Sequence, residues 1–71
     1  MSSEINKEEQ INGLKKVGLN SLMVDTKKKV IDTLATYGEK AIPAITEIID
    51  NSVMVEVREH GLDTIKKIKQ K

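Results

Sequence analysis

The six residues NSLMVD (20–25) return almost letter for letter as NSVMVE (51–56). The two copies lie 31 residues apart, and the same shift aligns residues 8–37 with residues 39–68 without a gap. Identical residues are spread through the whole unit: Glu8, Ile11, Asn20, Ser21, Met23, Val24, Asp32 and Thr33 meet Glu39, Ile42, Asn51, Ser52, Met54, Val55, Asp63 and Thr64. A fixed period of this length indicates one structural unit used twice.

Apolar residues recur at helical spacing in both halves of the unit. The first half carries Ile11, Leu14 and Val17 in one copy and Ile42, Ile45, Ile48 and Ile49 in the other; the second half carries Leu22, Thr26, Val30, Leu34 and Tyr37, then Val53, Val57, Gly61, Ile65 and Ile68. Steps of three and four residues predict amphipathic helices. We predict four helices, near 4–17, 22–37, 40–50 and 53–69, with short connections that make sequential helices antiparallel neighbours.

The repeated Asn-Ser lies at the junction between the two helices of each unit. Because Ser and Asn accept hydrogen bonds from the free amides of a first helical turn, Ser21 and Ser52, or the Asn before each, are predicted N-caps. Gly18 and Gly38 are predicted to close the two helices of the first unit. Pro43 suits the first turn of the third helix, where a missing amide costs little.

The stretch VREHGLDTIKKIK (57–69) resembles the second helix of a HEAT repeat, in the short form found in proteins similar to phycobilisome lyases. The matching features are Val57-Arg58, the small Gly61 three places after the arginine, and the later Ile65 and Ile68. The stretch EKAIPAITEIID (39–50) resembles the first helix of the same unit.

This resemblance implies an all-α chain with a single domain over residues 1–71. Two helical-hairpin repeats, about 4–37 and about 39–69, would form a four-helix fragment of a right-handed α-α superhelix. The first copy departs from the pattern, with Thr26-Lys27 for Val-Arg and Val30 for the small residue. Tetratricopeptide and ankyrin signatures do not occur in the chain. The resemblance implies a scaffold and no particular reaction.

The residue types needed for catalysis or metal binding are scarce. The chain has no cysteine, one histidine and one tyrosine, and it contains no phosphate loop or dinucleotide glycine pattern. His60 follows Glu59, and related HEAT-like hydroxylases bind iron through His-Glu pairs, but one histidine with one neighbour cannot assemble a metal site. We predict a surface histidine assisted by Glu56 one turn earlier. We therefore expect no enzyme activity, catalytic residue, metal or cofactor.

The charges nearly cancel, with 12 basic and 11 acidic residues and a net charge of +1. No whole-molecule field therefore attracts nucleic acid or an anionic membrane. We expect no membrane association, because no apolar run is long enough to span a bilayer and the N-terminal residues are polar. The absence of cysteine fits a cytoplasmic protein.

Lysine clusters leave an electrostatic alternative open. Five lysines are candidates for sequence-independent contacts with phosphates: Lys27, Lys28, Lys29, Lys66 and Lys67. Acidic residues offset these charges in the second unit, and the aromatic residues that stack on single-stranded bases are missing. Nucleic-acid binding is therefore the alternative function, and screened surface charge is the simpler explanation.

Leu62 is the most informative apolar residue, because it is the repeat copy of Ile31 and no third unit follows it. Helical repeats normally need about three units and polar terminal caps. We predict that a surface formed by Leu62, Met54, Val55 and Arg58 is covered by a second copy or by another protein. The alternative is that Leu62 folds back onto the core. The predicted function is a non-catalytic protein-interaction or scaffold module.

Overall fold

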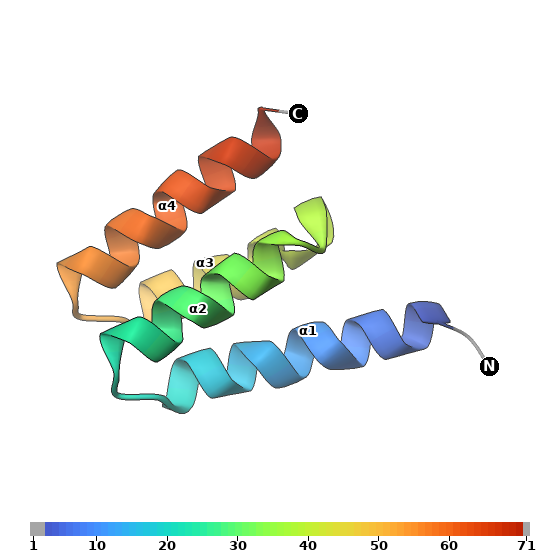
Figure 1. Ribbon diagram of the computed structural model, residues 1–71, viewed down its shortest axis with the longest axis horizontal. Coiled ribbons are helices and arrows are strands. Elements are labelled where there is room, and N and C mark those ends of the chain that lie inside the picture. Colours follow the sequence, from blue (N-terminus) through green and yellow to red (C-terminus); the bar gives the residue numbers. More distant parts are fainter. Residues whose placement is uncertain (1–2, 71) are drawn as a thin grey trace.

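The structure is a computed structural model that describes residues 3–70, with side chains from residue 7 onward. The described residues form helices and no strand (Figure 1). The elements are α1 (Ser3–Asn20), α2 (Val24–Ala35), the 3₁₀ helix η1 (Gly38–Ala41), α3 (Ile42–Asp50) and α4 (Val55–Lys69). The predicted all-α class and the four predicted helices are confirmed.

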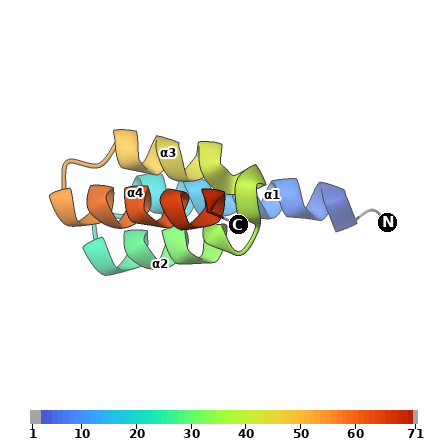
Figure 2. The ribbon, with the colours of Figure 1, turned by 90° about the horizontal axis from the view of Figure 1, so that it is seen from above.

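The helices form two antiparallel hairpins that stack side by side. Helix α1 pairs with α2 and α3 pairs with α4, while α2 contacts α4 and α1 contacts α3 across the two hairpins. The α1–α2 turn and the α3–α4 turn lie at the same end of the molecule (Figure 1). Helix α1 extends beyond the other helices at its N-terminal end (Figure 2). None of the helices in the described part of the chain is long and apolar enough to cross a membrane.

The core lies between the two hairpins and draws on every helix. Its most deeply buried residues are Ile31, Leu34, Ala41, Ile45, Ile48 and Val57, and Ile11, Val30, Ala44 and Ile49 surround them. Most of these residues belong to the two predicted apolar stripes, and burying each large aliphatic side chain stabilises the fold by about 1.5–3 kcal/mol. Val17 of the first stripe is half exposed, although its copy Ile48 is buried.

The two hairpins use the same packing position with the residue sizes exchanged. In the first hairpin Gly18 of α1 faces Val30 of α2, and a Cβ on Gly18 would lie 3.1 Å from Val30 Cγ1. In the second hairpin the equivalent residues are Ile49 and Gly61, and a Cβ on Gly61 would lie 2.5 Å from Ile49 Cγ1. The small and the large residue are thus exchanged between the facing helices of the two hairpins.

This packing corrects the prediction for Gly18, which lies inside α1 and does not end it. The helix continues to Asn20, three residues beyond the predicted end. Gly38 follows the end of α2 with φ +73°, a conformation that glycine adopts at little cost. Pro43 lies in the first turn of α3, as predicted.

The predicted serine caps are wrong, because α2 and α4 begin later than the sequence suggests. The N-cap residues are Met23 and Met54, and neither position has a side-chain cap. Instead, Ser21 Oγ accepts a hydrogen bond from the backbone amide of Met23 at 3.1 Å, and Ser52 Oγ accepts one from Met54 at 3.3 Å. The repeated serines therefore stabilise the turns before the helices.

The residues enclosed by these serine turns point into solvent. Leu22 is 91% exposed and Val53 is 90% exposed. Both had been assigned to the buried stripe of the following helix, and that assignment is wrong. Because the helix begins two residues later in each unit, these side chains never reach the core.

Candidate interaction surface on the last helix

The outer surface of α4 consists of residues that recur at steps of three and four. We call it the α4 outer face, formed by Val55, Arg58, Glu59, Leu62, Lys66 and Lys69, all of which are exposed. Val55 is 65% exposed and Leu62 is 58% exposed. Helix α4 is the last helix of the described residues, and Figure 2 shows no other helix drawn over it. The face is therefore open along its length.

The first hairpin shows why this face is open. Ile31 of α2 occupies the repeat position of Leu62 and is 0% exposed, because the second hairpin covers it. A Cβ on Gly61 of α4 would lie 3.5 Å from Ile31 Cδ1, so the two helices approach closely at this point. Among the described residues Leu62 has no such neighbour, and at 58% exposure it does not fold back onto the core.

The structure separates the four residues predicted to bind a partner. Leu62, Val55 and Arg58 lie together on the α4 outer face. Met54 is partly buried and packs against the core, whereas its copy Met23 is exposed. Met54 therefore supports the start of α4 and contributes little to the open face.

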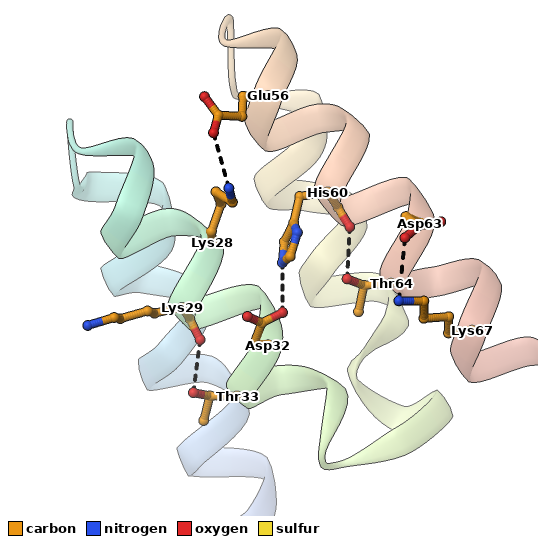
Figure 3. Close-up of polar contacts among 9 residues, drawn as sticks. All are labelled: Lys28, Lys29, Asp32, Thr33, Glu56, His60, Asp63, Thr64 and Lys67. Atoms are coloured by element: carbon orange, nitrogen blue, oxygen red, sulfur yellow. Dashed lines mark hydrogen bonds and ion pairs between the residues drawn. The ribbon is translucent and has the colours of Figure 1, made fainter.

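Polar contacts join α2 to α4 beside this face (Figure 3). Lys28 Nζ lies 3.1 Å from Glu56 Oε2, and His60 Nε2 lies 2.7 Å from Asp32 Oδ1. The prediction that Glu56 assists His60 is wrong, because Glu56 contacts Lys28 and His60 contacts Asp32. Both contacts join residues 28 positions apart in the chain.

The five lysines of the electrostatic alternative do not form one patch. Lys27 is 5% exposed, and its ammonium donates a hydrogen bond to the carbonyl oxygen of Gly18 at 2.6 Å. Lys28 pairs with Glu56, and Lys67 lies 3.6 Å from Asp63. Among the described side chains, only Lys29 and Lys66 of this set are without an ion pair or hydrogen bond, and they lie on different helices.

The burial of Lys27 was not foreseen from the sequence. The repeat predicts the same environment for Lys27 and its aligned residue Arg58, but Arg58 is exposed. The distinguishing feature is the nearby end of α1, because the ammonium of Lys27 reaches the carbonyl oxygen of Gly18 in the last turn of that helix. A cation is favoured there by the helix dipole.

An open groove of about 620 Å³ lies between α2 and α4. Its polar lining includes Asp32, His60, Asp63 and Lys67, which already pair with one another. Among residues 7–70, no three His, Cys, Asp or Glu side chains are placed to hold a metal ion. Four polar side chains of the groove are therefore already engaged with one another.

The α4 outer face is thus the most open apolar surface on a helix of the described chain, and it combines two aliphatic side chains with both signs of charge. Such a surface can pack against another helix and form ion pairs at its edges. Comparison of the chain with protein-family models, with curated proteins and with solved structures finds no match.

Proposed function

We propose that this protein is a non-catalytic interaction module made of two HEAT-like hairpins, a fragment of a right-handed α-α superhelix. Its α4 outer face contacts a protein partner. The observation that carries the proposal is the contrast between Ile31 and Leu62, which share one repeat position but are 0% and 58% exposed. A cytoplasmic location fits the cysteine-free chain.

The contacts between the hairpins support a preformed surface. The core between the two hairpins includes three fully buried residues, Ile31, Ile45 and Val57. Because this core is closely packed, α4 cannot rotate without disrupting it. A rigid surface binds without the entropy cost of ordering a flexible segment. The partner would pack an apolar side chain between Val55 and Leu62, with Arg58 as a peripheral anchor.

Site-specific crosslinking in the native cell tests this proposal. A photoreactive amino acid at Leu62 should capture a protein partner, whereas the same group at Leu22 should not. Leu22 is the matched control because it is an exposed leucine at a turn, away from the α4 outer face. Equal capture at both positions, or capture at neither, would refute the contact through α4.

The alternative is an electrostatic nucleic-acid binder that uses Lys29 and Lys66 with neighbouring lysines. It is the weaker candidate because Lys27 is buried and Lys28 and Lys67 are paired with acidic groups. Titration with DNA and RNA at increasing salt separates the two functions. Phosphate contacts weaken steeply with salt, whereas an apolar protein contact does not.

A further inference from the structure

We infer that the partner of the α4 outer face is a second copy of this chain, with the two α4 helices packed antiparallel around a two-fold axis at Leu62. This inference rests on the proposed function, because it names the partner of the same surface. Its basis is the placement of Glu59 before Leu62 and Lys66 after it along the axis of α4.

The helix geometry brings these opposite charges together. Glu59 precedes Leu62 by three residues and Lys66 follows it by four. At a rise of about 1.5 Å per residue, Glu59 lies about 4.5 Å from Leu62 toward the N-terminus of α4, and Lys66 lies about 6 Å from it toward the C-terminus. At about 100° per residue both lie on the same flank of α4. A two-fold axis perpendicular to two antiparallel helices keeps equal flanks together, so each Glu59 meets Lys66 of the second copy.

The apolar residues fit the same arrangement. Leu62 packs against Leu62 of the second copy on the axis, where symmetry requires a self-complementary contact. Val55 lies two turns from the axis and meets the aliphatic stem of Lys69 from the second copy. On the other flank Arg58 and Lys69 of the two copies carry like charges, which weakens the association and favours a reversible dimer.

A continued stack of hairpins is the competing arrangement, and the chain's own contacts argue against it. In such a stack the first hairpin of a second copy would cover α4 as the second hairpin covers α2. Glu59 would then stand in the place of Lys28, and Asp25 of the second copy would stand in the place of Glu56. These like charges would repel each other. The Ile31–Gly61 approach would become Leu62 against Val30, which has no room for it because Val30 fills the space beside Gly18.

One favourable contact would remain in that stack, since the Asp32–His60 pair would become Asp63 facing Lys29. The negative charge of Glu59 therefore has opposite effects in the two arrangements. It stabilises the two-fold dimer and destabilises the stack. This difference gives a direct test.

Sedimentation equilibrium from about 10 µM to about 1 mM, on the full chain, measures the association. A single helix pair is a small interface, so we expect a reversible dimer within this concentration range. Glu59→Lys or Lys66→Glu alone should weaken the dimer about tenfold, because each converts two attractive pairs into two repulsive ones. The double reversal Glu59→Lys with Lys66→Glu should restore it.

The matched control is Glu9→Lys with Lys16→Glu on α1, an exposed acid–base pair with the same seven-residue separation. It should leave the dimer unchanged, and circular dichroism should show equal helicity for all variants. Tighter association of Glu59→Lys, or no restoration by the double reversal, would overturn the two-fold dimer.

A monomer throughout the concentration range would also overturn it. The crosslinking experiment keeps the two proposals apart: capture of a different protein at Leu62, with the purified chain monomeric, would leave the proposed function standing and remove the second copy as the partner.

Discussion

Ile49 occupies the space that a side chain on Gly61 would need, since a Cβ on Gly61 would lie 2.5 Å from Ile49 Cγ1 and 2.6 Å from its Cδ1. The same position in the first hairpin reverses the sizes, with Gly18 on the first helix and Val30 on the second. Each hairpin has one glycine at this packing position, on its first helix in one case and on its second in the other. Beside Gly18 the nearest atom is Ile48 Cδ1 of the other hairpin, 2.6 Å from the Cβ position.

Gly61→Ala should destabilise the protein by about 1–3 kcal/mol, because Ile49 must move out of a well-packed position. The better helix propensity of alanine, worth about 1 kcal/mol, offsets part of this cost. Urea unfolding measures the change. In an Ile49→Ala background the same substitution should cost clearly less, since the obstructing side chain is gone.

Gly13→Ala is the matched control for this prediction. Gly13 also lies inside a helix, but a Cβ there would have no neighbour within 4 Å. The substitution should stabilise the protein by up to about 1 kcal/mol. A similar loss of stability at both glycines would contradict the packing explanation.

Lys27→Met should destabilise the protein by about 1–3 kcal/mol, because the carbonyl of Gly18 loses the ammonium that lies 2.6 Å from it in a buried position. Thermal or urea unfolding at low protein concentration measures the effect. The equivalent change Arg58→Met should alter stability by no more than about 0.5 kcal/mol, since that side chain is exposed. Equal effects would show that the buried hydrogen bond contributes nothing specific.

Ile31→Ala and Leu62→Ala compare one repeat position with and without a covering hairpin. Ile31→Ala should cost about 2–5 kcal/mol, because it leaves a cavity in the core. Leu62→Ala, measured where the chain is monomeric, should cost about 0.5 kcal/mol or less. A large loss at Leu62 in the monomer would mean that its side chain is buried after all.

The Lys28–Glu56 pair should couple the two hairpins weakly. A double-mutant cycle with alanine at both positions should give an interaction free energy of about 0.2–1 kcal/mol, because both side chains are partly exposed. The coupling should fall in about 1 M salt, where screening is strong. A coupling that salt leaves unchanged would show that the contact is not electrostatic.

The helical hairpins were predictable because their signals are local. Apolar residues at steps of three and four predict each helix from its own sequence, and a gapless shift of 31 residues predicts that the second hairpin copies the first. The starts of α2 and α4 were misplaced by two residues. A serine side chain can cap a helix or stabilise a turn, so Ser21 and Ser52 are compatible with both. In the structure their hydroxyl oxygens accept hydrogen bonds from the amides of Met23 and Met54, which form the turns before the helices.

The sequence by itself determined the helical class and most of the core, because these depend on the order of residues along one helix. Only the tertiary structure decided which equivalent residues differ in environment. Ile31 and Leu62 share a position, as do Lys27 and Arg58, yet one of each pair is buried and the other is exposed. The physical reason is that burial depends on what packs against a surface, and α4 has no further helix of the described chain beyond it.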